Sequence, residues 1–188
     1  MPAAQQSSTA AAPWRWAACC ALALLWLQPR PAAAQMSNPD VLKAEVIYRA
    51  LMFITWPPER EAAGRSLEIC TLGEGRVDGA LQSLAGRPIR QLTVSVRRLG
   101  RNDAPTGCHL LYLPAPQPAL RGALAEAPVL VVSDAAAMLD HGAMINLQVE
   151  DGRIVFDVEL DAARRAGLAV STKLLRLARF VRHQAPTP

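Results

Sequence analysis

The sequence predicts a single α/β domain in which a mixed, mostly parallel sheet carries helices on both faces and a C-terminal β-hairpin is followed by helices. Three observations support this prediction. Short apolar runs alternate with helical stretches between residues 67 and 132, as in sheets that are covered on both faces. Two alternating segments then flank an Asp-Gly pair, which is typical of a hairpin. Removing an N-terminal segment of 34 residues from the 188 leaves 154, the size of one domain.

The N-terminal segment has the three parts of a secretory signal. It carries Arg15 and no acid, then an apolar run from Trp16 to Leu27, and it ends in the small residues Ala32 to Ala34. The apolar run is too short for a membrane span of about 20 residues. We therefore expect cleavage after Ala34, a mature domain over residues 35–188 outside the cytoplasm, and a disordered tail at 184–188.

The charge of the mature chain argues against a nucleic-acid partner. The whole chain has 20 basic and 16 acidic residues, a net charge of +4. The signal removes Arg15 and Arg30 and no acid, so the mature domain carries 18 basic and 16 acidic residues, or +2. A nucleic-acid-binding domain needs a basic footprint, which a nearly neutral exported domain lacks.

The first predicted helix begins at Asn38-Pro39-Asp40, which supplies an N-cap, a proline at the first helical position and an acid in the first turn. Apolar residues then recur every three or four positions, and Trp56-Pro57-Pro58 stops the helix. The residues of this stripe are Val41, Ala44, Ile47, Leu51 and Ile54.

Four strands and two helices follow. Apolar runs predict strands over residues 67–72, 92–96, 108–113 and 129–132, with helices over 77–84 and 115–125. Residues 144–149 and 154–158 then flank Glu150-Asp151-Gly152-Arg153 and predict the hairpin. On its second strand, Phe156 is expected to face the core.

The end of the chain predicts two helices. Asp161 is expected to cap a short helix that Gly167 ends, and Ser171 to begin an amphipathic helix that runs to about Arg182. Basic residues recur every third position along this last helix, opposite an apolar stripe. A solvated face is the simpler interpretation. The alternative is a docking face for an acidic partner or an anionic membrane surface, formed by Lys173, Arg176, Arg179 and Arg182 and enlarged by Arg164 and Arg165.

The mature domain keeps two cysteines, Cys70 and Cys108, because Cys19 and Cys20 lie in the signal. Two cysteines outside the cytoplasm favour one disulfide, although a pair of buried thiols is the alternative. The sequence separation of 38 residues would give a stabilisation of roughly 4 kcal/mol in the chain-entropy model.

No catalytic, metal or cofactor site is predicted. Gly73-Glu74-Gly75 follows a strand as a phosphate loop would, but no third glycine or Gly-Lys-Ser/Thr follows. His109, His141 and His183 show no ligand spacing. Neighbours in a strand point to opposite faces, so Cys108 and His109 do not form a nucleophile–base pair.

Five stretches, in this order and spacing, resemble the YfiR-like family of periplasmic regulators. The fifth, which runs from Asp151 through the final helical region, is the most specific. The stretches cover residues 53–58, 67–73, 107–113 and 129–134, and finally 151–160 with 162–168 and 171–178.

The resemblance implies a compact domain, often dimeric, that binds the periplasmic part of an inner-membrane diguanylate cyclase and holds it inactive, which lowers cyclic-di-GMP and affects biofilm formation. Cys70 and Cys108 match a disulfide of the family. A second disulfide of some relatives has no counterpart here, and Glu159 stands where the family usually has Asn. A periplasmic small-molecule sensor is the alternative function.

Overall fold

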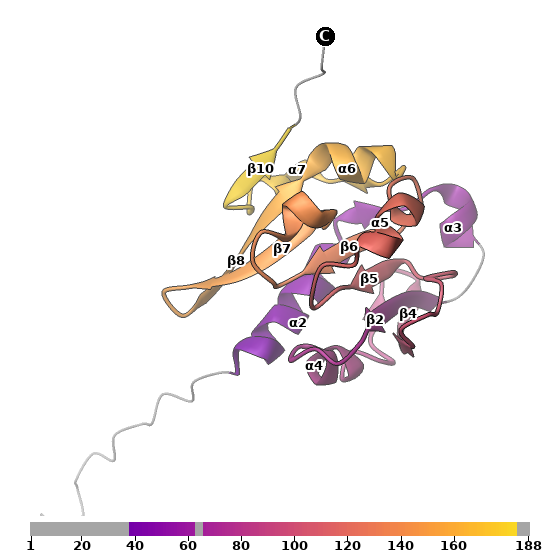
Figure 1. Cartoon of the computed structure of the whole chain (residues 1–188), viewed down its shortest axis with the longest axis horizontal. Coiled ribbons are helices and arrows are strands. Elements are labelled where there is room, and N and C mark those ends of the chain that lie inside the picture. Colours follow the sequence, from indigo (N-terminus) through magenta and orange to yellow (C-terminus); the bar gives the residue numbers. More distant parts are fainter. Residues whose placement is uncertain (1–37, 63–65, 184–188) are drawn as a thin grey trace, which may run out of the picture. The chain divides into compact units, whose positions relative to one another are not determined.

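The computed structural model describes residues 38–62 and 66–183. Its main sheet has eight strands in the order β10-β8-β7-β6-β5-β2-β4-β3, of which Figure 1 labels all but β3. A separate pair joins β1 to β9. The strands of the main sheet are β2 (Ser66–Leu72), β3 (Pro88–Ile89), β4 (Leu92–Leu99), β5 (Leu110–Tyr112), β6 (Leu130–Ser133), β7 (Ile145–Glu150), β8 (Arg153–Glu159) and β10 (Phe180–Arg182). The small pair consists of β1 (Ile54–Thr55) and β9 (Ala169–Val170).

The sheet is mixed and mostly parallel, as the sequence predicts. Strands β4, β2, β5, β6 and β7 are parallel neighbours, β8 runs antiparallel to β7, and β10 is parallel to β8. All four predicted strands and both hairpin strands are present, each with small shifts at the ends. Strand β3 and the β1–β9 pair are additions that the sequence analysis did not predict.

Helices cover both faces of the sheet. They are α2 (Pro39–Leu51), α3 (Pro58–Ala62), α4 (Asp78–Gln82), α5 (Pro118–Leu124), α6 (Leu160–Arg165) and α7 (Thr172–Leu175), with a 3₁₀ helix η2 (Met138–His141). Helix α2 packs through Ile47 and Ala50 against side chains such as Leu130 and Phe156. Val131, which follows Leu130 in β6, points to the other face of the sheet, toward α5, η2 and α6. Phe156 is buried, which confirms its predicted inward orientation.

Helix α2 begins as predicted and ends earlier. The Asn38 side chain accepts a hydrogen bond from the Asp40 backbone N–H at 2.9 Å, and Pro39 is the first helical residue. The helix ends at Leu51, so Ile54 lies in β1 instead of the helical stripe. Val41 is 54% exposed, which shows that the buried stripe starts one turn later than predicted.

The hairpin confirms its turn prediction. Glu150 pairs with Arg153, which leaves Asp151 and Gly152 as a two-residue loop. Their φ angles are +48° and +73°, as a type I′ turn requires, and glycine adopts such angles without a steric penalty.

The predicted final helix is wrong beyond its first turn. Ser171 is the N-cap, and its hydroxyl accepts a hydrogen bond from the Lys173 N–H, but α7 ends at Leu175. Residues 180–182 form β10 instead, and the Arg179 N–H donates to the Phe156 carbonyl at 2.9 Å. Pairing with the free edge of β8 therefore overrides the helical spacing. The preceding helix, α6, also differs slightly, because its N-cap is Glu159 and Asp161 lies in its first turn.

Candidate functional site

Four of the basic residues of the predicted docking face, Arg164, Lys173, Arg176 and Arg179, lie at the C-terminal end of the described chain, where α6, α7 and β10 are neighbours (Figure 1). All four are exposed. Arg164 lies in α6 and pairs with Asp161 at 3.2 Å. Lys173 lies in α7, Arg176 is its C-cap, and Arg179 directly precedes β10. Because α7 is short, these residues do not share one helical face.

Arg179 differs from the others because it joins β10 to the hairpin. Its guanidinium contacts both carboxylate oxygens of Asp157, one of them at 2.9 Å, and it also bonds to Glu150 and, at 3.2 Å, to Gln148. The hydrogen bond with Asp157 raises the pKa of the Arg179 guanidinium above its ordinary value. The Asp157 side chain is only 9% exposed, so Arg179 neutralises a nearly buried charge. Its main contacts are therefore within the domain.

Arg182, the last residue of β10, makes a similar connection three residues further along the chain. Its guanidinium bonds to the buried carboxylate of Glu159 and to Asp140 at 2.6 Å. The hydrogen bonds with Asp140 and Glu159 raise the pKa of Arg182, and the bond with Arg182 lowers the pKa of Asp140. Two arginines thus attach the edge strand to β8.

The side chains of Lys173 and Arg176 have no hydrogen-bonding or ion-pair partner within residues 38–62 and 66–183. Two apolar side chains beside them are also exposed: Leu177 by 67% and Phe180 by 55%. We name these four residues, Lys173, Arg176, Leu177 and Phe180, the C-terminal edge surface. Sequence analysis missed Leu177 and Phe180 because it assigned the segment to a helix. The sequence did indicate that a helix is unsuitable here, since Phe180 falls outside the apolar stripe of the predicted helix.

Cys70 and Cys108 form a disulfide, with their Cα atoms 5.8 Å apart. Cys70 lies in β2, Cys108 lies two residues before β5, and both are fully buried. The alternative of two buried thiols does not hold in this structure. One guanidinium nitrogen of Arg97 lies 3.7 Å from the Cys70 sulfur and 3.6 Å from the Cys108 sulfur.

His109, next to the disulfide, is buried, and both of its ring nitrogens contact the backbone. Its Nδ1 accepts a hydrogen bond from the Glu68 backbone N–H at 3.0 Å, and its Nε2 lies 3.3 Å from the Arg60 carbonyl oxygen. These contacts fit a neutral ring that carries its proton on Nε2. Burial lowers the pKa of His109 below its ordinary value. The ring also packs edge-on against Trp56, with centroids 5.8 Å apart.

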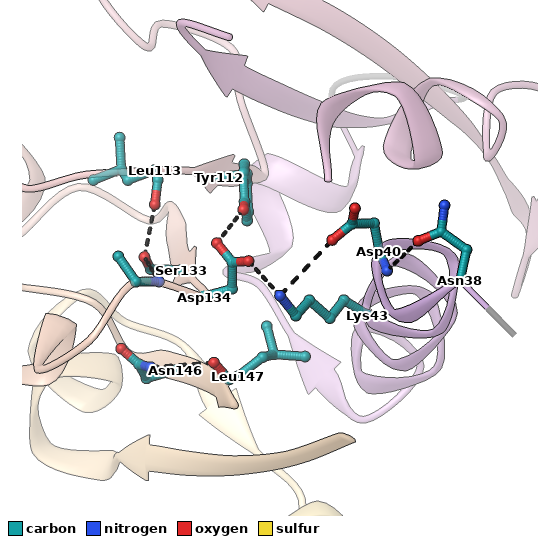
Figure 2. Close-up of polar contacts among 10 residues, drawn as sticks. Asn38, Asp40, Lys43, Tyr112, Leu113, Ser133, Asp134, Asn146 and Leu147 are labelled. Atoms are coloured by element: carbon teal, nitrogen blue, oxygen red, sulfur yellow. Dashed lines mark hydrogen bonds and ion pairs between the residues drawn. The ribbon is translucent and has the colours of Figure 1, made fainter. Parts of the chain in front are cut away.

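A second polar cluster lies where β5 and β6 end, and Figure 2 shows how its side chains converge. Lys43 of α2 binds the Asp134 carboxylate at 2.6 Å and lies 3.9 Å from Asp40. The Tyr112 hydroxyl donates to the other oxygen of Asp134. Burial and that hydrogen bond raise the pKa of Tyr112. The cluster therefore ties the start of α2 to the sheet through satisfied contacts.

Among the described residues, no three His, Cys, Asp or Glu side chains are placed to hold a metal ion. His109 is buried next to the disulfide, whereas His141 is exposed in η2. The prediction that neither histidine is catalytic stays a prediction.

The predicted signal at residues 1–34 and the predicted disordered tail at 184–188 lie outside the described residues. In the described part of the chain, no helix has both the length and the apolar character needed to cross a membrane.

A comparison with models of protein families matches residues 40–179 to the YfiR/HmsC-like family. The matched region extends from the first turn of α2 to Arg179, which directly precedes β10. It includes the disulfide, the hairpin and most of the C-terminal edge surface. The chain therefore belongs to the YfiR/HmsC-like family.

Proposed function

We propose that this protein is a periplasmic, non-enzymatic regulator that binds the periplasmic part of an inner-membrane diguanylate cyclase and restrains it, which lowers cyclic-di-GMP. Membership of the YfiR/HmsC-like family supports this proposal, because that family suggests periplasmic regulators of such a cyclase. The predicted secretory signal and the buried disulfide are typical of an oxidising compartment outside the cytoplasm.

The C-terminal edge surface carries the proposal. It combines two exposed apolar side chains, Leu177 and Phe180, with the unpaired cations Lys173 and Arg176. Protein interfaces characteristically have an aromatic or aliphatic centre surrounded by charged residues. The cations would steer docking onto an acidic surface, and Phe180 would supply the buried contact. Arg164 extends the same cationic surface on α6, whereas Arg179 contributes by fixing β10.

Strand β10 adds a second reason for docking at this place. It pairs with β8 on one side and ends the main sheet on the other. An edge strand has free backbone N–H and C=O groups that a partner's strand can bind. The family resemblance also implies a homodimer, in which a second copy of this chain could pair with this edge. The mass of the protein in solution tests whether it is a dimer.

A bacterial strain that contains the chain and its cognate cyclase tests the function. The double variant Leu177→Ser, Phe180→Ser should raise cyclic-di-GMP and lose co-purification with the tagged cyclase, because it removes the apolar centre. The charge reversal Lys173→Glu, Arg176→Glu should weaken both readouts and make them more sensitive to salt. Exposed substitutions of this kind change the free energy of unfolding by only about 0.5 kcal/mol.

Arg101→Glu is the matched control. Arg101 is exposed and follows β4, at the opposite side of the sheet from β10. Reversing its charge should leave repression and co-purification at the wild-type level. If both double variants stay folded, retain the cyclase and repress it fully, the C-terminal edge surface is not the docking site.

The alternative function, a small-molecule sensor, is favoured by one separate observation, a cavity under α5 and α6. A ligand that binds the folded domain would raise its melting temperature.

A further inference from the structure

A cavity of about 110 Å³ lies between the sheet and the layer formed by α5, η2 and α6. A water molecule needs about 10–15 Å³ of such space, so this cavity has room for one small organic molecule or several waters. Apolar side chains from four elements and two connecting segments form about half of its wall. They are Leu113, Leu124, Val131, Leu139, Met144 and Ala162.

Basic groups also line the cavity. Arg121 comes from α5 and Arg165 from the last turn of α6, and both are exposed. Neither guanidinium makes a hydrogen bond or an ion pair within the described ranges 38–62 and 66–183. A Cβ atom on Gly142 would lie 3.9 Å from the Cγ of Arg121, which places the Arg121 stem against the end of η2. His141 lines the same cavity.

Glu159 supplies the opposite charge. Its side chain is 2% exposed, and its Oε2 is bonded to Arg182. Its Oε1 is buried and has no hydrogen-bond partner among the described residues. A buried carboxylate oxygen without a donor is unfavourable, so it calls for an N–H or O–H group. The residue lines the cavity, from which such a group could come.

We propose that this cavity binds a small organic carboxylate that has an apolar body and one hydroxyl or amino group. Arg121 and Arg165 would bind the carboxylate, the apolar walls would cover the body, and Glu159 would accept a hydrogen bond from the donor group. Apolar walls with a few convergent polar groups are the usual composition of a small-molecule site. A purely apolar ligand would leave both arginines unpaired, and an inorganic anion would leave the apolar walls uncovered. The inference is independent of cyclase binding.

The probe is 4-hydroxybenzoate, titrated calorimetrically into protein purified from the periplasm of cells that express the full chain. Benzoate, which lacks the donor, should bind about tenfold more weakly, because one hydrogen bond to a charged group is lost. The neutral compound 4-methylphenol lacks the carboxylate and should bind at least tenfold more weakly than 4-hydroxybenzoate. If none of the three compounds gives saturable binding, the cavity holds water only and the proposal is overturned. If 4-methylphenol binds as tightly as 4-hydroxybenzoate, the carboxylate assignment is wrong.

Two adjacent arginines of α6 provide a matched pair of variants. Arg165→Ala should weaken 4-hydroxybenzoate at least tenfold, since Arg165 lines the cavity. Arg164→Ala should leave its affinity unchanged, since Arg164 lies outside the cavity lining and pairs with Asp161. Ala162→Leu should fill the cavity and abolish binding. Should that variant fail to fold, the arginine pair still decides, because equal affinities for the two arginine variants would contradict the site.

Discussion

Strands β2 and β10 belong to one sheet, yet different interactions hold them. Strand β2 lies between β4 and β5, most of its side chains are buried, and the disulfide joins it to the segment before β5. Strand β10 lies at the edge, none of its residues is buried, and Arg179 and Arg182 attach it to carboxylates of the hairpin and of η2. Apolar burial and a covalent bond dominate at β2, whereas ion pairs dominate at β10.

This difference indicates which region can respond to a partner. Burial of apolar area and a disulfide depend little on ionic strength, whereas ion pairs at a surface weaken as salt rises. The elements that move when a protein binds or switches come from the less stable parts of its structure. The C-terminal edge therefore suits a regulatory contact, and the disulfide region suits a fixed support.

Among these tests, removal of the disulfide should change the free energy of unfolding most. The double variant Cys70→Ala, Cys108→Ala should lose about 2–4 kcal/mol of the free energy of unfolding, because its unfolded chain is no longer cross-linked. Denaturant titration measures the loss. A reductant should destabilise the wild type to a similar extent and leave the variant unchanged. A wild-type protein whose two thiols are shown to be free before reduction would contradict the assignment.

Breaking the attachment of β10 should have the next largest effect. Arg182→Met leaves the Glu159 carboxylate buried without its cation, which we expect to cost about 1–3 kcal/mol. Adding Glu159→Gln should recover most of this loss, because the uncompensated charge disappears. Equal stability of the wild type and Arg182→Met, measured in the same denaturant series, would show that the pair does not hold β10.

His109 should make the disulfide region sensitive to acid. Its folded-state pKa is lower than the ordinary value of about 6.5, so the unfolded chain binds the proton more readily. Stability is therefore complete above about pH 6.5 and falls as the pH drops from there through the folded-state pKa. His109→Asn keeps an acceptor for the Glu68 N–H and cannot titrate, so its melting temperature should change less between pH 7.5 and pH 5. Parallel pH profiles for both proteins would refute this cause.

The smallest expected effect is a local one on β10. Raising NaCl from about 0.05 M to about 1 M shortens the Debye length from more than 10 Å to about 3 Å. Amide hydrogen exchange in β10 should then accelerate, because the ion pairs of Arg179 with Glu150 and of Arg182 with Asp140 lie at the surface, whereas exchange in β2 should not change. Acceleration of both strands by the same factor would mean that salt acts on global unfolding instead.

The central strands and the hairpin could be predicted from local sequence, because apolar runs and the Asp151-Gly152 turn are local signals. The disulfide could also be predicted, since only two cysteines lie outside the predicted signal. The end of the chain was not, because the three-residue spacing of its basic side chains imitates a helix. What decides its structure is the free edge of β8 and the carboxylates of Asp157 and Glu159, which are distant in sequence.

The candidate site shows the same limit. Lys173 and Arg176 were predicted as exposed and are exposed. The exposure of Leu177 and Phe180 could not be predicted, because it follows from the end of α7 at Leu175, where the sequence predicted a continuing helix. The cavity was also invisible in the sequence, because its lining comes from segments between residues 113 and 165 that only the fold assembles.

The β1–β9 pair affects the order in which the strands of the domain can pair during folding. Ile54 pairs with Val170, so this contact cannot form until nearly all of the domain has emerged on the side of the membrane where it folds. Strands β2, β4, β5 and β6 can associate earlier, since each needs only residues before position 134. A chain that emerges N-terminus first can therefore pair β8 with β7 before β10, which covers the free edge of β8, is available. Such an edge can pair with another chain, so holding the unfinished protein apart from its neighbours would favour correct folding.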